Sequence, residues 1–519
     1  MEEYYFWFMS LGFFFILLFS KFITQKYYWA SNHRRVLPPS PPSIPIIGHL
    51  HLLRNKKEPL HRTFHKLSKK YGHVLFLRLG VRNLLVISSP SAVEECFTKN
   101  DVIFANRPRS LAGKHLNYNY KSLLWAPYGD YWRTLRRLTT LELFSAKQLT
   151  MLMNFRKEEV RVLLKELFED CGGSTSGNWA KVELRPRLKK LSFNVMMKMI
   201  AGKRYYSEDG AEEEASSFRE LIKELKAIHG ISNLNDFFPV LQVVDFQGVE
   251  KRMMELMKKM DRFFQNLIDE HRRVRSDGVC IESKPTLIDI MLSLQQTDPE
   301  FYTDETMKGV ITSIIRAGTE SASTAVEWSM SLLLNHPDEM KKARAEIEAN
   351  VGLERPLDEA DLPKLEYLQK IYTEAIRLYP PAPLLVPRES SEECTINGFH
   401  VPRGTQLLVN AWSIHRDPEL WENPTEFMPY RFGSGKTSGT EGCKMIPFGV
   451  GRRACSGAPL GKRLMGLILG ALIQCFDWEK IDGKEIDMAE GLGQAMAKAE
   501  PFEALCKPRQ DTISFLSTL

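Results

Sequence analysis

The chain has 519 residues, of which 43% are hydrophobic and 26% charged, and its formal net charge at pH 7 is +6. These proportions are typical of a globular protein with a substantial core. The charge is small for this length, and no basic run is interleaved with aromatic residues, so nucleic acid is not a predicted partner. The eight cysteines have no paired spacing, which predicts reduced, mostly structural thiols in a body that faces the cytosol.

The N-terminal segment is apolar from Tyr4 to Ser20 and continues past Lys21 to Ile23. About 20 such residues cross a bilayer, and the long side chain of Lys21 can reach its surface. Acidic residues precede the segment and basic residues follow it, which places the N-terminus in the lumen and the body in the cytosol. We therefore predict a membrane anchor over residues 1–25. A cleaved signal peptide is the alternative, but a basic leading segment and a clean cleavage site are missing.

Residues 26–48 are basic and proline-rich, with five prolines between positions 38 and 45. Such a segment cannot continue a helix and favours a stiff, extended chain. We predict a hinge that sets how the body sits on the membrane, with Ile44, Ile46 and Ile47 docked onto the fold. A disordered linker is the alternative.

Residues 49–519 are predicted to form one large domain that is mainly α with a minor β portion, without internal repeats. A helix over 59–71 precedes two short strands, Val74–Leu79 and Leu84–Ile87, and a second helix covers Ser91–Lys99. Residues 104–127 have the composition of a long functional loop. Helical patterns then dominate from Tyr131 to about residue 379, with polar breaks near 171–178, 205–214 and 276–283. Short strands, a helix over 458–475 and a strand-poor tail follow.

The most informative segment runs from Phe448 to Gly457. It places Cys455 in a glycine-rich loop, behind two arginines and directly before an apolar helical run. Backbone amides and the positive end of that helix would favour a thiolate. No cysteine or histidine lies close enough in the sequence to complete a tetrahedral set of zinc ligands. A haem iron is therefore the leading candidate for the metal that this thiolate binds. This reading predicts an oxygen-activating enzyme.

Two further patterns bear on the same chemistry. Glu374 and Arg377 share one helix face and can pair, and Arg431 in an irregular segment could join them, although a surface pair is the alternative. The segment Ala317–Ser321 lies in the middle of a long predicted helix from about Asp304 to Asn335. Glycine and small polar residues there reduce helix stability and open a groove, for which a functional reason is the natural explanation.

Together these segments resemble the cytochrome P-450 (haem-thiolate) monooxygenases across essentially the whole chain. The family pattern F-x-x-G-x-R-x-C-x-G is met by Phe448, Gly451, Arg453, Cys455 and Gly457. The resemblance implies haem b with Cys455 as its axial thiolate and Phe448 and Arg453 beside it. It also implies a structural role for Glu374, Arg377 and Arg431.

The resemblance extends to other site residues. Trp132 and Arg136 match the W-x-x-x-R helix of the family, which implies that they hold a haem propionate together with Arg388 and Arg453. Glu320 and Ser321 occupy the acid and alcohol positions that supply protons during oxygen activation.

The chain departs from the usual pattern at three positions. Ser321 stands where threonine is usual, so we expect retained activity with poorer coupling of electrons to product. Ser456 replaces a common proline and Tyr430 a common glutamate, and neither change removes a ligand or a charge partner on which the resemblance depends.

The anchor, the hinge and segments such as Ala411–Pro418 are similar to plant members at the endoplasmic reticulum, in the group of isoflavone hydroxylases and sesamin-forming enzymes. This likeness implies electrons from NADPH through an NADPH-cytochrome P-450 reductase. It also implies hydroxylation of a hydrophobic isoflavonoid or other phenolic. The alternatives are oxidative methylenedioxy-bridge formation or phenol coupling, a non-catalytic haem membrane protein, and a peroxide-rearranging relative that needs no reductase.

The resemblance implies substrate contacts from four segments, which are mostly small and apolar and so predict a flat hydrophobic substrate. These segments are the 104–127 loop, Ile314–Ser321, Ala382–Val386 and Gly493–Ala497. Within the loop, Asn117, Tyr118 or Tyr120 could bind a phenol, although tyrosines exposed on the loop surface are the alternative.

Overall fold

The computed structural model describes residues 36–519 apart from 54–57, 174–177, 207–211, 230–232, 244, 246, 278–284 and 434–442. The predicted anchor over residues 1–25, the first part of the hinge and Cys280 therefore lie outside the described residues. Among the described residues, no helix combines the length and apolar character needed to cross a bilayer.

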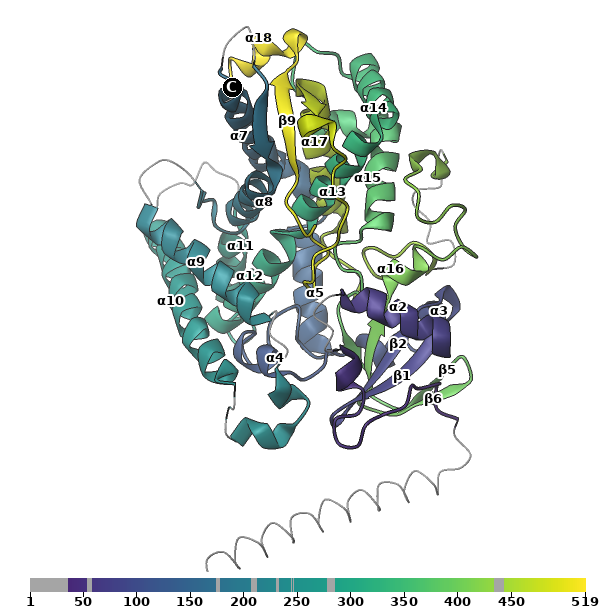
Figure 1. Cartoon of the computed structure of the whole chain (residues 1–519). Coiled ribbons are helices and arrows are strands. Elements are labelled where there is room, and N and C mark those ends of the chain that lie inside the picture. Colours follow the sequence, from purple (N-terminus) through teal and green to yellow (C-terminus); the bar gives the residue numbers. More distant parts are fainter. Residues whose placement is uncertain are drawn as a thin grey trace, which may run out of the picture.

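Most of the described chain is helical, and the predicted class of a mainly α fold with a minor β portion is confirmed (Figure 1). The longer helices are α2 (Leu60–Tyr71), α5 (Asp130–Glu142), α7 (Met153–Asp170), α8 (Leu184–Ala201), α9 (Glu212–His229), α10 (Val249–Ser276), α11 (Leu287–Thr297), α12 (Asp304–Gly318), α13 (Ser321–Asn335), α14 (Pro337–Asn350), α15 (Glu366–Leu378) and α17 (Ala458–Cys475). The shorter ones are α3 (Pro90–Phe97), α4 (Leu111–His115), α6 (Ala146–Met151), α16 (Ala411–Ile414) and α18 (Ile513–Leu516).

The strands form small sheets at two ends of the molecule. One sheet has the order β1 (Val74–Leu79), β2 (Arg82–Ile87), β7 (Gln406–Val409) and β4 (Arg388–Glu389), with β1 antiparallel and β7 parallel to β2. A second has the order β3 (Ala180–Glu183), β9 (Glu503–Pro508) and β8 (Phe476–Glu479). A hairpin joins β5 (Cys394–Ile396) and β6 (Phe399–Val401). The tail predicted to be strand-poor contains two paired strands, because β8 pairs with β9 and β9 also pairs with β3, more than 300 residues earlier in the chain.

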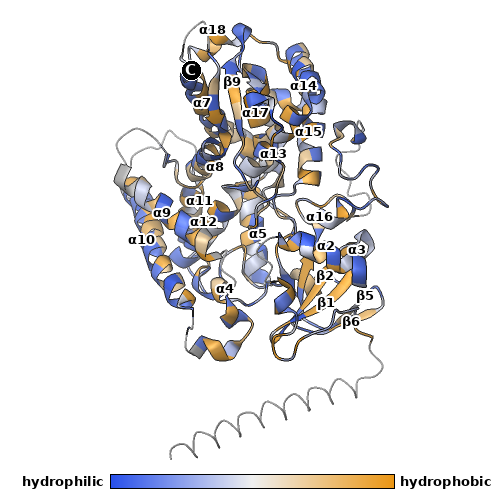
Figure 2. Ribbon diagram, in the orientation of Figure 1, coloured by the Kyte–Doolittle hydropathy of each residue, from blue (hydrophilic) through white to orange (hydrophobic). Residues whose placement is uncertain are grey.

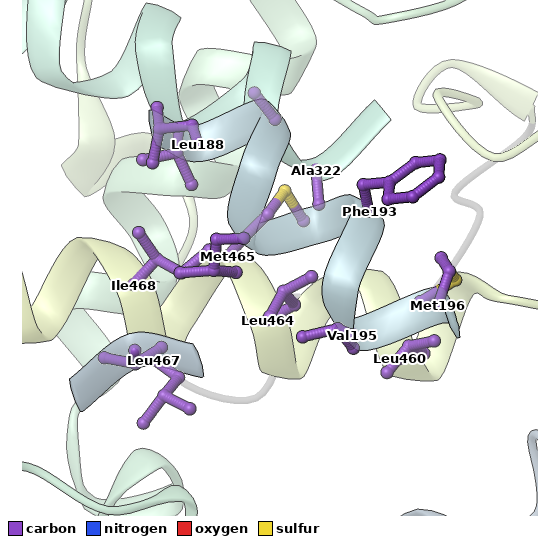
Figure 3. Close-up of a cluster of buried hydrophobic side chains, with 14 of the residues drawn as sticks. Leu188, Phe193, Val195, Met196, Ala322, Leu460, Leu464, Met465, Leu467 and Ile468 are labelled. Carbon is purple, nitrogen blue, oxygen red and sulfur yellow. The ribbon is translucent and has the colours of Figure 1, made fainter. Parts of the chain in front are cut away.

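The core lies where α13 packs against α8 and α17 (Figure 3). Every residue of α13 from Ala322 to Leu334 is buried, so this helix is enclosed on all sides, as expected for a central helix. Figure 3 shows Leu460 and Leu464 of α17 beside Val195 and Met196 of α8. Burying each such side chain contributes about 1.5–3 kcal/mol, which fixes α17 and the cysteine loop at its N-terminus.

The outer helices follow the opposite pattern. Figure 2 shows hydrophilic and hydrophobic residues alternating along α10 and α14, as expected for amphipathic helices at the surface. In α10, Met253, Leu256 and Met260 are buried, while the lysines between them remain exposed or half-buried.

Two sequence-based expectations require correction. The helix predicted from about Asp304 to Asn335 is two helices, because α12 ends at Gly318 and α13 begins at Ser321. In the hinge, Ile44 and Ile46 are 45% and 70% exposed and do not dock. Ile47, the third predicted contact, is half-buried, and its carbonyl accepts a hydrogen bond from the backbone N–H of Gly80 at 3.3 Å. The prolines add to the docking, since Pro38 and Pro41 are buried and the carbonyl of Pro39 accepts a hydrogen bond from the backbone of Phe76 at 2.9 Å.

Candidate active site

The cysteine loop closes tightly just before α17. The backbone N–H of Cys455 donates to the carbonyl of Phe448 at 2.9 Å. Gly451 has a φ of +71°, and a Cβ atom there would lie 2.5 Å from a carboxylate oxygen of Asp101. That carboxylate also accepts two hydrogen bonds from the backbone N–H of Arg452, each 3.2 Å long. Asp101 thus positions the loop, and the sequence analysis did not select it.

The environment of the Cys455 thiol contains the predicted donors. The backbone N–H groups of Gly457 and Ala458 and the guanidinium of Arg136 favour the thiolate. The side chain is accessible, yet protein atoms surround it closely enough that desolvation is the largest influence and raises the pKa of the thiol. The predicted preference for the thiolate is therefore not met by these protein groups alone. A metal cation at the sulfur would favour the deprotonated form.

Buried arginines gather beside the loop. Arg453 donates from Nε to the carbonyl of Ala105 at 2.7 Å, and its guanidinium lies 4.1 Å from the ring centroid of Trp132. Arg388 donates to the carbonyl of Val450 at 2.7 Å. Burial, followed by the positive charges of Arg388 and Arg136, lowers the pKa of Arg453 to about 9, and burial lowers that of Arg388 to about 10.

This cluster is only partly neutralised. The Nη1 atoms of Arg388 and Arg453 are both buried, and neither has a hydrogen-bond partner among the described residues. The carboxylate of Asp101 lies 3.7 Å from Nη1 of Arg388. Buried cations of this kind call for anionic partners with several acceptor oxygens, and the two propionates of a haem meet that requirement. The residues present therefore fit haem.

A second buried ionic cluster is centred on α15. Arg377 forms a bidentate pair with Glu374, with distances of 2.7 and 2.8 Å, and both side chains are fully buried. Arg431 donates to the same carboxylate at 2.9 Å. The three residues therefore form one ionic cluster, as the sequence predicted. Because Glu374 and Arg377 are buried, the alternative of a pair on the protein surface is excluded. His415, which the sequence analysis did not select, bonds to this cluster and to the segment that precedes the cysteine loop.

The break between α12 and α13 has a definite geometry. Ser321 donates from Oγ to the carbonyl of Ala317 at 3.1 Å, and both residues are exposed. A Cβ atom on Gly318 would lie 2.3 Å from the sulfur of Met196, so only glycine allows α12 to approach α8 this closely. The interruption predicted at Ala317–Ser321 is therefore a true end of one helix and start of the next.

Glu320 lies beside a small cavity at this break. Lys189 on α8 is 3.6 Å from its carboxylate. The cavity, of about 30 Å³, is also lined by Arg185, Ser323 and Glu327. A polar space of this size can hold a water molecule. The sequence analysis found Glu320 but not its basic neighbours, which come from a helix more than 100 residues earlier.

The loop side chains considered for phenol binding are engaged within the protein. Tyr118 donates to Asp261 at 3.2 Å, and Tyr120 donates to the carbonyl of Ser110 at 3.0 Å. Asn117 is fully buried and donates to the carbonyl of Ala112 at 3.0 Å. The expectation that these groups present free donors to a phenol is therefore not supported. Neither tyrosine is fully exposed, because residues 111–115 of this loop form α4 and fold the loop against α10.

Comparisons with known proteins agree with this geometry. The family model described as Cytochrome P450 matches residues 38–505. Cytochrome P450 81Q32 of Catharanthus roseus is 50% identical over 94% of each chain. Isoflavone 3'-hydroxylase of Medicago truncatula is 46% identical over 96% of this chain and 98% of its own. The (+)-piperitol/(+)-sesamin synthase CYP81Q2 of Sesamum radiatum is 47% identical over 91% of each chain.

The fold is also similar to that of solved cytochrome P450 structures. A zebrafish cytochrome P450 solved with progesterone superposes with a TM-score of 0.74 at 25% identity, over 87% of this chain and all of that one. A mainly helical domain with a cysteine loop and a cluster of buried arginines beside it is the arrangement of a haem-thiolate oxygenase. The chain belongs to the cytochrome P450 family. It is a monooxygenase that uses haem with a cysteine thiolate ligand and receives electrons from a reductase.

Proposed function

We propose that this enzyme hydroxylates a hydrophobic plant specialised metabolite, an isoflavonoid or another phenolic. The observation that supports this substrate class is the 46% identity, over almost the full length of both chains, to an isoflavone 3'-hydroxylase. The accessible, small side chains of Ala317 and Ser321 leave room for a flat molecule beside the α12–α13 break.

We propose that the thiolate of Cys455 would hold the haem iron, with Phe448 beside it in the loop. Trp132, Arg136, Arg388 and Arg453 would hold the propionates, and the unpartnered Nη1 atoms of Arg388 and Arg453 support that role. Haem held by these residues would supply dioxygen activation, with electrons from the reductase. Glu374, Arg377 and Arg431 would hold the backbone that carries the loop.

Glu320 and Ser321 are proposed to move protons to the reaction. Glu320 and Lys189 are 3.6 Å apart and both line the water-sized cavity, so Glu320 can exchange protons with a water molecule held there. Ser321 holds its proton on Oγ toward the carbonyl of Ala317 and can turn it toward the reacting molecule by rotation about one bond. Serine lacks the methyl group that limits threonine rotamers, so this proton is less well oriented.

The proposed organisation is a membrane anchor over residues 1–25, a hinge over 26–48 and the catalytic domain over 49–519. The body would face the cytosol at the endoplasmic reticulum and accept electrons from NADPH-cytochrome P450 reductase. The exposed side chains of Val36, Ile44 and Ile46 support a membrane position, because they leave the hinge apolar on its outer side.

A second function is favoured by one specific observation. The 47% identity to a (+)-piperitol/(+)-sesamin synthase supports oxidative closure of a methylenedioxy bridge as the alternative outcome. Both functions need the same haem site and differ in whether the product gains an oxygen atom or loses two hydrogen atoms.

A product assay separates them. Microsomes that contain the full chain and a plant reductase receive NADPH and a panel of isoflavones, lignans and simple phenolics, and mass spectrometry identifies the products. We expect products that gain one oxygen. Loss of two hydrogens would establish ring closure instead. The absence of any NADPH-dependent product, from a preparation with full haem content, would contradict the proposed substrate class.

A further inference from the structure

Arg316 occupies an unexpected position in the last turn of α12. It directly precedes Ala317 in a helix whose residues from Thr306 to Ile315 are all buried. Burial lowers the pKa of Arg316 to about 10, so the side chain still carries its charge at neutral pH. No carboxylate among the described residues lies within ion-pair distance of it. Arg316 itself is half-buried, so its charge has lost part of its water without gaining an anionic partner.

The guanidinium is held by neutral groups. Nη1 donates to Oδ1 of Asn117 at 3.3 Å, and the guanidinium carbon lies 5.3 Å from the ring centroid of Trp125. Asn117 is itself fixed, because its Oδ1 also accepts a hydrogen bond from Ser122 at 2.9 Å. One hydrogen bond and one cation–π contact restrain the side chain but do not neutralise it.

The remaining donors of Arg316 are available. Nε and Nη2 have no hydrogen-bond acceptor among the described residues, and both atoms remain accessible to solvent. The same face of α12 contacts the 104–127 loop, where the backbone N–H of Leu124 donates to Ser313 at 3.2 Å. Arg316 therefore lies where that loop meets the helix, one residue from the accessible Ala317 and five from Ser321.

We propose that Arg316 binds an anionic oxygen of the substrate, a carboxylate or an ionised phenol, through Nε and Nη2. This inference rests on the proposed function, in which the substrate lies between the 104–127 loop and the α12–α13 break. It changes the expectation of purely apolar contacts: the substrate is a hydrophobic molecule with one acidic group, held at the loop while another part reaches the haem. The planar fork of a guanidinium suits two parallel hydrogen bonds to such a group.

The test uses the full-length, haem-loaded protein and probes that bind the haem iron at one end. These are ω-(imidazol-1-yl)alkanoic acids of increasing chain length, each paired with its methyl ester, and ω-(imidazol-1-yl)alkyl phenols paired with their methyl ethers. Binding is measured from the shift in haem absorbance. We expect one chain length at which the acid or phenolate binds at least about tenfold more tightly than its capped partner.

Three variants assign that preference to Arg316. In Arg316→Gln the ratio between acid and ester should fall to about one, while Arg316→Lys should retain part of it. Asn117→Asp places a carboxylate beside Arg316 and should also reduce the preference, without removing the guanidinium. Arg161→Gln, at an exposed position on α7, removes the same charge and should leave the ratio unchanged.

The outcomes are distinguishable. Imidazole alone should shift the haem absorbance of every variant, which shows that the site is loaded and folded. Equal binding of acids and esters at all lengths by the unmodified protein, or a preference that persists in Arg316→Gln, would overturn the role of Arg316 and leave the proposed function standing. A protein that takes up no haem and shows no shift with imidazole would overturn the proposed function and this inference together.

Discussion

Arg377 and His415 each bind the main-chain carbonyl of the other. Arg377 donates from Nη1 to the carbonyl of His415 at 2.5 Å, and Nδ1 of His415 lies 3.1 Å from the carbonyl of Arg377. On its other side, His415 accepts the backbone N–H of Ile446 at Nε2, 2.9 Å away. The imidazole thus connects the ionic cluster on α15 to the segment that enters the cysteine loop, and both bonds together require the neutral ring with its proton on Nδ1.

The buried state of His415 predicts a specific pH dependence. Burial, followed by the nearby charge of Arg377, lowers the pKa of His415 to about 3, whereas an unfolded chain binds this proton near pH 6.5. The unfolded state therefore gains a proton first, and stability is lost as the pH falls from about 6.5 toward 3. At pH 5 this loss is about 2 kcal/mol.

The variant His415→Gln tests this linkage. A glutamine can donate to the carbonyl of Arg377 and accept from Ile446, so we expect a loss of only about 1 kcal/mol at pH 7. Because glutamine does not titrate, stability between pH 6.5 and 5 should fall less steeply than in the unmodified protein. Haem release during denaturation at pH 7, 6 and 5 measures this. His415→Ala, which leaves the Ile446 N–H without a partner, is the destabilised reference, and parallel slopes for the unmodified protein and His415→Gln would contradict the prediction.

Removing the carboxylate of Glu374 should be far more damaging. In Glu374→Gln the buried guanidiniums of Arg377 and Arg431 lose their common anion, and we expect a loss of about 3–5 kcal/mol and little haem-loaded protein. The ratio of haem to protein absorbance after purification reports this loss.

The matched control is Asp338→Asn. Asp338 and Lys341 form a pair with the same spacing on α14, but both side chains are about 80% exposed. Exposed pairs contribute about 0.2–1 kcal/mol, so this variant should retain its haem. Equal haem content in the two variants would show that the buried cluster does not support the loop.

The sequence predicted those parts of the fold whose signals are local. The strand Val74–Leu79 and the helix over 458–475 are confirmed at their predicted bounds, because a short β-rich run and a longer, mainly apolar run each lie within one segment. The pairing of Glu374 with Arg377 was also visible, since the two residues share a helix face. These elements need no information from distant segments.

The remaining parts depend on distant segments. Asp101 closes the cysteine loop from about 350 residues away, and no spacing rule connects an aspartate at the end of a short helix to Gly451. Likewise, β3 pairs with β9 across the whole domain, and neither strand is long enough to show a clear pattern. The direction of the pKa shift of Cys455 could not be predicted from the sequence either, because desolvation depends on how the surrounding elements pack around the thiol.

The role proposed for Cys455 predicts a spectroscopic loss. Replacing it by serine removes the thiolate, so the reduced carbon monoxide complex should lose the absorbance of a thiolate-ligated haem, and NADPH-dependent turnover should fall below detection. Cys443→Ser is the control, because Cys443 is half-buried in the segment leading to the same loop and makes no predicted contact with haem. An unchanged spectrum in Cys455→Ser would exclude this residue as the ligand.

The last prediction concerns the hydroxyl of Ser321. Threonine at this position would keep the bond from Oγ to the carbonyl of Ala317 and add a methyl group that restricts rotation of the side chain. We expect Ser321→Thr to release less hydrogen peroxide per NADPH consumed and to form more product. Ser321→Ala should do the opposite, because it leaves no hydroxyl proton at this position.

The neighbouring carboxylate provides the comparison. Glu320→Gln keeps the side-chain shape beside Lys189 but cannot accept and return a proton, so turnover should fall by about 10²–10⁴-fold while haem binding is unchanged. Peroxide release, NADPH consumption and product are measured together in reconstituted microsomes. If peroxide release is the same in Ser321→Thr and the unmodified enzyme, the rotational freedom of serine is not what limits coupling, and proton supply through Glu320 becomes the step to examine.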